Sequence, residues 1–476
     1  MRFPLHSSEG SDLRRPLDKI YASLPIPIQN LMCTADGYRR FRQRFTRHFH
    51  ACLAQWEESV DRPLAWHHEN QWRQLKVLIE RARNDVYYYR FLPEPIETGE
   101  AFESITQTLN EIPPLEKSVY RARTADFLSS RLNRVDYTRR FTSGTTGTAL
   151  KIFDSADRLA ENYAVVWRQR RSFGVDLGDP FLAFTGQMIV PITQTDEPFW
   201  RRDYHSKRTL FSIYHMSPKN LVDYVDPIHD SEASYVEGYP SALHLVSRAM
   251  IESGRCLPAG RLKAVFTSSE SLLAYQRERI EEAFGAPIRD HYASTEHVVA
   301  MTSCRLGRLH VDMEFGIVEV EPMEETEEWV RGPLLVTGLG NPPAPMIRYR
   351  IGDIGTRLKA PCECGRPGDV YLDIDGRIED YVVTQSGRLI GRLDHVFKGR
   401  SDIVESQILQ SEASALVVHV VPSGGYSEDS RRRLVSDLHE RVGREMKIEI
   451  RELDRIEREP NGKFRAVKST VAGLRI

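Results

Sequence analysis

The chain has 476 residues, which is too long for one compact core and predicts more than one domain. Its 41% of hydrophobic residues are enough for buried sheets, and a formal net charge of −2 excludes a general attraction to nucleic acid or anionic lipid. No apolar run approaches the roughly 18 residues of a membrane span, and the N-terminus lacks the apolar core of a signal peptide, so we expect a cytoplasmic protein.

Residues 12–90 are predicted to be mostly helical. Within a helix expected over residues 37–48, Phe41, Phe45 and His48 fall on one face, with arginines around it. A nucleic-acid-binding or membrane-binding arm is one interpretation of this pattern. The near-neutral chain favours the alternative, an ordinary solvated amphipathic helix. A second helix is expected from about Trp72 to the tyrosines at 87–89.

Between residues 135 and 375 the chain alternates strand-like and helix-like segments, which is typical of an α/β domain. We expect a strand over 262–267, a helix over 273–284 and a strand over 288–292. Residues 310–312 and 316–321 are predicted to pair as a β-ribbon, with the acidic residues 324–328 as its solvated turn.

A Gly- and Pro-rich segment at 340–345 interrupts the regular secondary structure. Near Gly376 the sequence becomes more charged. Beyond it we expect a smaller unit with strands over 415–421 and 446–452 and a helix over 429–442. The predicted domains are 1–376, of which 1–130 are largely helical, and 377–476. The fold class is α/β, a large N-terminal domain with mixed sheets and helices followed by a small α+β domain.

Six cysteines in a chain of this length do not form a disulfide framework. Cys362 and Cys364 are closer together than the usual zinc-knuckle pair, and no second pair lies nearby in the sequence. A tight turn is the favoured interpretation, and a metal site stays open as the alternative. The other cysteines are isolated and predicted to be inert: Cys33, Cys52, Cys256 and Cys304.

Seven small residues follow a strand expected over 135–141: Thr142, Ser143, Gly144, Thr145, Thr146, Gly147 and Thr148. Glycine permits close backbone approach, and successive N–H groups can form an anion-binding concavity. The loop is not a Walker P-loop, because no Gly-Lys-Ser/Thr ends it and Lys151 lies four residues beyond Gly147. A flexible linker is the alternative, and the loop alone does not decide between them.

Four further segments point to one chemistry when they are taken with this loop. They are 292–296 (YASTE), 348–353 (RYRIGD), 376–380 (GRIED) and 461–465 (NGKFR). In this order the five motifs resemble the adenylate-forming (acyl-activating) superfamily, in particular its phenylacetate–CoA ligase-like branch, which includes adenylating proteins found with capsular-polysaccharide genes. Segments 87–90, 112–117, 237–241 and 405–410 extend the resemblance over nearly the whole chain.

The resemblance implies that ATP and Mg²⁺ activate a small carboxylic acid as an acyl-adenylate. Tyr292 would stack on adenine, Asp353 would bind the ribose hydroxyls, and Glu296 would hold Mg²⁺, which prefers oxygen ligands. The residues implied to contact the nucleotide are Thr142, Ser143, Gly144, Thr145, Thr146, Gly147, Ser269, Glu270, Tyr292, Ser294, Thr295, Asp353 and Arg377.

Lys463 would be the catalytic lysine, because a compact, mobile ammonium can bridge the substrate carboxylate and the α-phosphate. The resemblance also implies a mobile C-terminal domain, with a hinge at Glu379, that brings this lysine to ATP. An ordinary charged turn after Gly462 is the alternative interpretation.

The chain departs from the family in two places. Thr148 stands where the family often has lysine, and residues 384–390 replace an Arg-Gly turn that faces the thiol acceptor. Adenylation is therefore better supported than coenzyme A as the second substrate. Coenzyme A is still the expected acceptor, and a carrier-protein thiol, an amine or an alcohol is the alternative. A binding protein that has lost catalysis is a third hypothesis, which intact Glu296, Asp353 and Lys463 oppose.

The acyl pocket is the least defined part of the site, and each of its candidates has packing as an alternative. These candidates are Gln187, His215, Tyr239 and Pro240. The identity of the acid and the oligomeric state, including a homodimer, are left open by the sequence.

Overall fold

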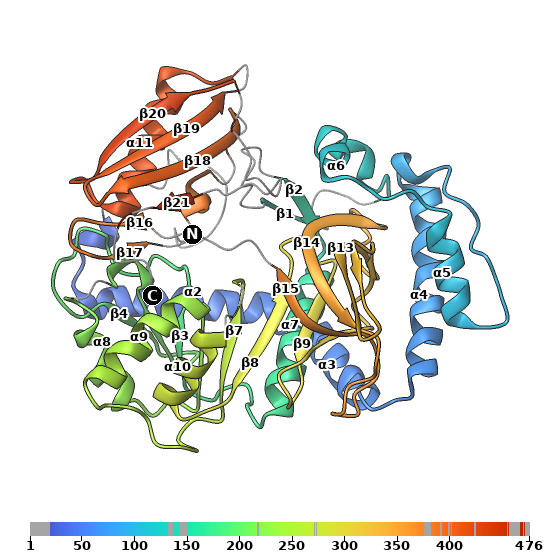
Figure 1. The fold of residues 1–476 in the computed structure, drawn as a ribbon, viewed down its shortest axis with the longest axis horizontal. Helices are drawn as coiled ribbons and strands as arrows, with labels where there is room; N and C mark the ends of the chain where they lie inside the picture. The colour runs from blue at the N-terminus through green and yellow to red at the C-terminus, as the bar shows by residue number, and fades with distance from the viewer. Residues whose placement is uncertain are drawn as a thin grey trace.

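The computed structural model describes residues 20–131, 137–141, 150–216, 219–270, 272, 274–375, 382–390, 393–397, 400, 402–422, 425–454, 456, 467–469 and 471. The loop at 142–148, Arg377, Glu379 and Lys463 lie outside these residues. Figure 1 shows one long sheet crossing a large α/β unit, with a smaller sheet of C-terminal strands above one end of it. The predicted fold class is confirmed.

The N-terminal region is helical, as predicted, with α2 (Ile26–Arg44), α3 (Arg47–Ser59) and α4 (Leu64–Asp85). A continuous helix over 37–48 is wrong, because the side chain of Thr46 caps a new helix by accepting from the backbone N–H of Phe49. Phe45, at the break, packs edge-to-face on Phe49 and Trp167. Phe45 therefore packs against the protein, whereas the His48 side chain of the same predicted face is 38% exposed.

Thirteen strands form the large sheet, in the order β11-β13-β14-β15-β10-β9-β8-β7-β6-β3-β5-β4, with β12 paired to β13. Strands β5, β3, β6, β7 and β8 are parallel, and the other pairs are antiparallel. The strands are β3 (Phe181–Phe184), β4 (Trp200–Asp203), β5 (Arg208–Phe211), β6 (Tyr235–Gly238), β7 (Ala264–Ser268), β8 (Ile288–Ala293), β9 (Ala300–Ser303), β10 (Leu309–Val311), β11 (Gly316–Val320), β12 (Glu324–Glu325), β13 (Trp329–Gly338), β14 (Tyr349–Leu358) and β15 (Val370–Asp375).

Helices cover both faces of the parallel half of this sheet, because successive residues of a strand point to opposite faces. Val236 and Val265 pack in one cluster with α8 (Val222–His229), α9 (Pro240–Glu252) and α10 (Ala274–Phe284). Tyr235 and Phe266, their neighbours in sequence, pack on the other face with α3 and α7 (Ala156–Ser172). The antiparallel half is covered by α4 and α5 (Ala101–Asn110).

The β-ribbon predicted from residues 310–312 and 316–321 is wrong. Strand β10 lies between β9 and β15, whereas β11 pairs with β13. Glu324 and Glu325 form the short strand β12 instead of the ribbon's turn. The alternation of side chains identified these strands, but it carries no information about which strands pair.

The C-terminal unit is a four-stranded sheet of order β20-β19-β18-β21 with one long helix, and its predicted elements are confirmed. Its elements are β18 (Ile403–Glu412), β19 (Ala415–Pro422), α11 (Glu428–Val442), β20 (Lys447–Glu452) and β21 (Val467–Ser469). Strands β18 and β21 were not predicted. The short hairpin of β16 (Val382–Val383) and β17 (Leu389–Ile390) precedes them.

This unit contacts the large one at Tyr214. Arg388 donates to the backbone oxygen of Tyr214 at 2.9 Å, and Arg441 donates to its hydroxyl at 2.6 Å. The predicted boundary between domains, at residue 376, falls outside the described residues and stays a prediction.

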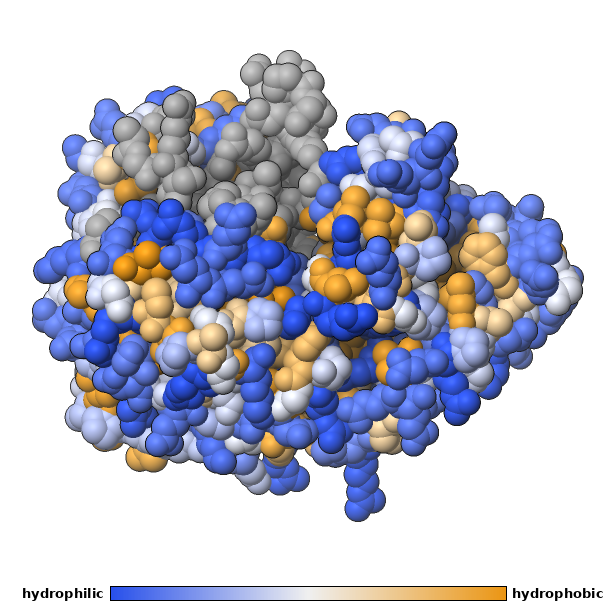
Figure 2. Space-filling view, turned by 60° about the horizontal axis from the view of Figure 1, so that its bottom comes forward, coloured by the Kyte–Doolittle hydropathy of each residue, from blue (hydrophilic) through white to orange (hydrophobic). Residues whose placement is uncertain are grey.

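The face of the molecule in Figure 2 is mostly hydrophilic, with its hydrophobic residues in small groups. Among the helices of the described part of the chain, none is long and apolar enough to cross a bilayer.

Candidate functional site

The carboxyl ends of the parallel strands meet at one edge of the sheet. Phe184 pairs with Gly238, Gly238 with Thr267, and Ser268 with His291, so the segments that follow β3, β6, β7 and β8 leave the sheet side by side. Ligands of open α/β sheets bind at such an edge. Several of the predicted site residues, including Ser269 and Tyr292, therefore lie there.

Tyr292 and Asp353 are in direct contact although β8 and β14 are not neighbouring strands. The Tyr292 hydroxyl donates to Asp353 Oδ2 at 2.7 Å. Burial, and then the nearby Asp353 carboxylate, raise the pKa of the Tyr292 phenol well above its ordinary value, so it remains a donor. The residues predicted to bind adenine and ribose are thus brought together.

Glu296 lies in the turn after β8, where its side chain is buried. The Tyr349 hydroxyl donates to Glu296 Oε1 at 3.1 Å, and Lys117 Nζ lies 3.5 Å from the same oxygen. Burial, and then Glu296, raise the pKa of Tyr349 well above its ordinary value. The carboxylate is therefore held by a neutral donor and one cation.

The donors around this turn fit a cation and phosphate oxygens. A carboxylate oxygen is the ligand type that Mg²⁺ prefers. Ser294 Oγ is buried and has no hydrogen-bond partner among the described residues, which leaves a hydroxyl free for a ligand. Thr295, next to it, is exposed.

The two strands that flank the glycine-rich loop are attached to this same turn. Strands β1 (Thr138–Phe141) and β2 (Lys151–Asp154) form an antiparallel stem in which Phe141 pairs with Lys151. Arg140 of the stem donates to the backbone oxygen of Thr295 at 3.0 Å. The stem that leads into and out of the loop at 142–148 is therefore held to the turn that carries Glu296.

His297 completes the attachment of the stem. Its backbone has a φ of 51°, and its Nδ1 lies 2.8 Å from Arg140 Nη2. Burial, and then the cations of Arg140 and Arg158, lower the pKa of His297 well below its ordinary value. A neutral imidazole can accept the hydrogen bond from Arg140.

Comparison with known proteins agrees with this arrangement. A crystal structure of 2-hydroxyisobutyryl-CoA ligase with 2-HIB-AMP and CoA, in the thioesterification state, superposes with a TM-score of 0.54 at 20% identity, over 86% of this chain and 90% of that one. The postadenylation state with 2-HIB-AMP gives 0.50 at 19% identity, over 86% and 90%. The chain has the fold of the adenylate-forming ligases.

The C-terminal part adds a second similarity. Residues 382–470 match the family of CapK C-terminal domains. The chain is also 24% identical over 454 residues to Protein CapK of Staphylococcus aureus, with 94% of this chain and 98% of that protein covered. The predicted resemblance to the adenylate-forming superfamily is confirmed at the level of the fold, and these matches agree with its capsular-polysaccharide-associated branch.

In this adenylate-forming fold, three candidate acyl-pocket residues gather at the ends of β3 and β6. The Tyr239 N–H donates to Phe184 O at 3.0 Å, and a Cβ on Gly186 would lie 3.1 Å from the Tyr239 hydroxyl. Gln187 follows this glycine directly, and Pro240 begins α9. These residues share one region, and their contact with an acyl group stays a prediction.

His215 has the contacts of a packing residue. Its Nδ1 lies 2.7 Å from Ser212 Oγ, its Nε2 lies 3.1 Å from Pro191 O, and its ring stacks on Phe199. Burial, and then Arg388, lower the pKa of His215 to about 3. Both ring nitrogens are therefore engaged within the chain, and a role for His215 in binding the acyl group stays untested.

Ser269 and Glu270 follow β7 at the same edge, as the sequence predicted. Ser269 is exposed and has a φ of 72°, so its backbone is in the left-handed region. Their contact with nucleotide stays a prediction. Three residues now placed beside the site were given no role from the sequence: Lys117, Arg140 and Tyr349.

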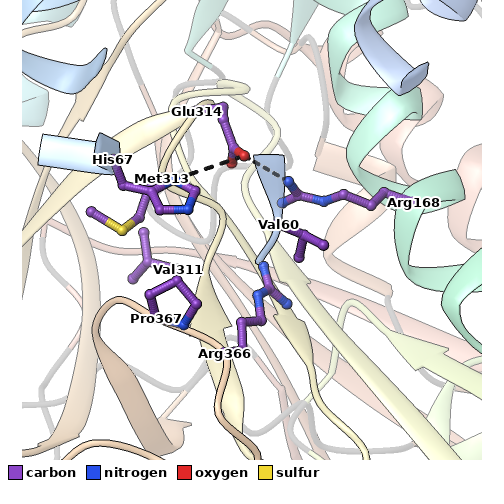
Figure 3. A pocket seen from close by; sticks show the side chains of 8 residues that line it. All are labelled: Val60, His67, Arg168, Val311, Met313, Glu314, Arg366 and Pro367. Carbon is purple, nitrogen blue, oxygen red and sulfur yellow. Dashed lines mark hydrogen bonds and ion pairs between the residues drawn. The ribbon is translucent and has the colours of Figure 1, made fainter. Parts of the chain in front are cut away.

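A different pocket, shown in Figure 3, contains none of the predicted site residues. Arg168 pairs with Glu314 at 2.9 Å, and His67 Nδ1 lies 4.0 Å from Glu314. Burial opposes ionisation of Glu314, but Arg168, the hydrogen bond from Ser59 and the other nearby donors together outweigh it and lower the pKa of Glu314 to about 2. The Arg168–Glu314 ion pair of this buried ionic cluster ties α7 to the segment after β10, and His67 of α4 packs beside it.

Proposed function

We propose that the protein activates a small carboxylic acid with ATP to form an acyl-adenylate and pyrophosphate, and then transfers the acyl group to a thiol, with coenzyme A as the favoured acceptor. The observation that carries the proposal is the convergence of three separate motifs. Arg140 joins the stem of the glycine-rich loop to the turn of Thr295, and Tyr292, before that turn, contacts Asp353. The adenylate-forming fold supports the same chemistry.

In the first step a carboxylate oxygen of the substrate attacks the α-phosphorus of ATP, and the bond to pyrophosphate breaks. Catalysis of phosphoryl chemistry is mostly positioning and charge stabilisation. Asp353 would accept hydrogen bonds from the ribose hydroxyls while Tyr292 lies against adenine. Ser294 and Thr295 would approach the α-phosphate, for which the unpartnered Ser294 hydroxyl is suited.

Glu296 would be the protein ligand of Mg²⁺. When bound, this cation supplies neutralisation of the phosphate charge. Lys117 and the hydroxyl of Tyr349 contact the Glu296 carboxylate. We propose that these two groups orient the buried carboxylate for this role.

Lys463 would supply the remaining positive charge, between the substrate carboxylate and the α-phosphate. This role requires the C-terminal unit to close over the nucleotide, with Arg377 approaching from the junction and Glu379 as the hinge. A second orientation would then admit the acceptor. Closure also excludes water, which would otherwise hydrolyse the acyl-adenylate.

A second candidate function is transfer to a carrier-protein thiol, an amine or an alcohol. The hairpin of β16 and β17 motivates it, because this hairpin replaces the Arg-Gly turn of the phenylacetate–CoA ligases. Its Arg388 is buried and bonded to Tyr214 O at 2.9 Å and to Val442 O at 3.3 Å, so it presents no charge to an acceptor.

The test is acid-dependent exchange of labelled pyrophosphate into ATP, screened over aromatic, fatty and amino acids. We expect exchange with a restricted set of acids, followed by a thioester when coenzyme A is added. Release of AMP with a carrier protein or amine, but never with coenzyme A, would select the second function. Absence of ATP binding in calorimetry would favour a non-catalytic binding protein.

A further inference from the structure

Sulfur and nitrogen donors gather at the end of β9 that is opposite the Glu296 turn. Cys304 follows β9 directly, His310 lies in β10, and Cys362 and Cys364 lie in the connection from β14 to β15. One ligand atom from each of these four side chains lies within 4.8 Å of all the others. Cys304 was predicted to be isolated. This prediction is wrong, because the fold brings three other possible ligands next to it.

Two backbone turns place these donors. The β9–β10 turn is closed by Gly307 N–H donating to Cys304 O at 2.9 Å. The turn predicted at Cys362 is confirmed, since Gly365 N–H donates to Cys362 O at 3.1 Å and Gly365 has a φ of 86°. Pairing of His310 with Val370 brings the two turns together.

The distances fit a tetrahedron around one metal ion. Zinc–sulfur bonds of about 2.3 Å and zinc–nitrogen bonds of about 2.0–2.1 Å give ligand–ligand edges of roughly 3.5–3.8 Å. Cys304 Sγ lies 4.0 Å from Cys362 Sγ, and Cys364 Sγ lies 3.3 Å from His310 Nε2. These separations bracket the tetrahedral edges.

We propose that Cys304, His310, Cys362 and Cys364 bind one structural Zn²⁺ ion. Three thiolates and an imidazole suit zinc, whereas Mg²⁺ requires oxygen ligands. Four protein ligands leave no open position, as in structural zinc sites. Arg366 N–H also points to Cys364 Sγ at 3.4 Å, the kind of outer contact that orients a ligand.

The ion would fasten the β9–β10 turn to the β14–β15 connection. Arg366, two residues after Cys364, donates to Thr302 Oγ1 at 2.9 Å and pairs with Asp312, which Arg168 also contacts. Arg366 and Arg168 both line the pocket of Figure 3. Metal binding would therefore hold in place the loop that supplies one arginine of the buried ionic cluster.

A second group of possible ligands provides an internal control. His48, Cys52 and Glu161 also lie close together, but they offer three donors with a single thiol, and the His48 side chain is 38% exposed. We do not assign a metal to this group. Cys52→Ser is therefore the matched control for substitutions in the four-residue cluster, and Cys256→Ser is a control outside both groups.

The experiment measures metal in the full-length chain, purified under reducing conditions without chelator. We expect about one zinc per chain by elemental analysis, as one closed site requires. The double variant Cys362→Ser/Cys364→Ser should lose it, while Cys52→Ser and Cys256→Ser keep it. A wild-type chain without stoichiometric zinc after zinc reconstitution would overturn the proposal, as would zinc lost only from Cys52→Ser.

A measurement on the unaltered chain covers the case in which the double variant does not fold. Thiol alkylation followed by mass spectrometry should show Cys304, Cys362 and Cys364 protected in the zinc-loaded chain and alkylated after chelation. Cys256 should react equally in both states. Equal reactivity of all four cysteines with and without zinc would contradict the assignment.

Discussion

The two ends of strand β9 carry opposite kinds of ligand chemistry. Before the strand, the turn of Glu296 offers a carboxylate and the hydroxyl of Ser294, and after it Cys304 begins a group of three thiols and one imidazole. Oxygen donors suit a cation that arrives and leaves with a nucleotide, whereas thiolates suit one that stays. A strand of four residues therefore separates a proposed catalytic site from a proposed structural site.

The largest effect on activity should come from Lys463, which would act only at the end of β9 that carries Glu296. Lys463→Ala should slow acid-dependent pyrophosphate exchange by about 10²–10³-fold, the usual cost of losing one group that stabilises transition-state charge. Acyl transfer from a preformed acyl-adenylate should fall far less, and zinc content should not change. Lys447→Ala, an exposed lysine in β20, is the control. Equal loss in both half-reactions would contradict the assigned role.

Glu296→Gln should produce the next largest effect, since it removes a negative oxygen but keeps the shape of the side chain. We expect pyrophosphate exchange to fall by roughly 10–100-fold, the range for loss of a metal-binding contact, and to recover in part at high Mg²⁺. The exposed Glu327→Gln is the control. An unchanged Mg²⁺ requirement would exclude Glu296 as the cation ligand.

Removal of zinc from the cluster that begins at Cys304 should lower the thermal stability of the chain more than its rate of pyrophosphate exchange. The variant Cys362→Ser/Cys364→Ser should unfold several degrees lower in a thermal melt, because the two turns are no longer fastened together. Below that temperature it should retain most of the wild-type exchange rate. A variant with a wild-type melting temperature but no pyrophosphate exchange would show that this cluster serves catalysis. That result would contradict the division into a catalytic and a structural site.

The smallest effect should come from His215, which belongs to neither end of β9. Burial lowers its pKa to about 3, so the folded chain holds it neutral while the unfolded chain protonates it below its ordinary pKa of about 6.5. Its contribution to stability is thus present above pH 6.5 and decreases by about 1.4 kcal/mol per pH unit below it. In urea unfolding from pH 6.5 to 5, His215→Gln should show a shallower decrease than the wild type; an identical slope would contradict this.

Local patterns predicted many elements of this fold but not their partners. Strands β7 and β8 and the helix α10 lie within two residues of their expected positions, because alternation and turn residues act locally. The pairing of strands depends on residues far apart in the sequence. The predicted pairing of β10 with β11 was therefore wrong. The break before α3 was missed because the capping role of Thr46 depends on one side-chain hydrogen bond within a continuous apolar pattern.

The candidate site shows the same division. Tyr292, Glu296 and Asp353 were identified by family motifs, and the structure places Tyr292 against Asp353. Arg140 carries no such motif, and Lys117 lies in a family segment that predicted no role for it, so both were placed beside the site only by their contacts. Cys304 and Cys362 are 58 residues apart, so sequence spacing could not reveal the four-ligand cluster.

The central claim is that Tyr292, Glu296 and Asp353 act on one magnesium-bound nucleotide. Calorimetric titration of Mg²⁺·ATP into the wild type, Tyr292→Ala, Glu296→Gln and Asp353→Asn tests it most directly, with Glu327→Gln as the control. We predict that the wild type and the control bind one equivalent and that all three site variants bind more weakly. Wild-type affinity in all three site variants would show that the nucleotide binds elsewhere and would contradict the claim.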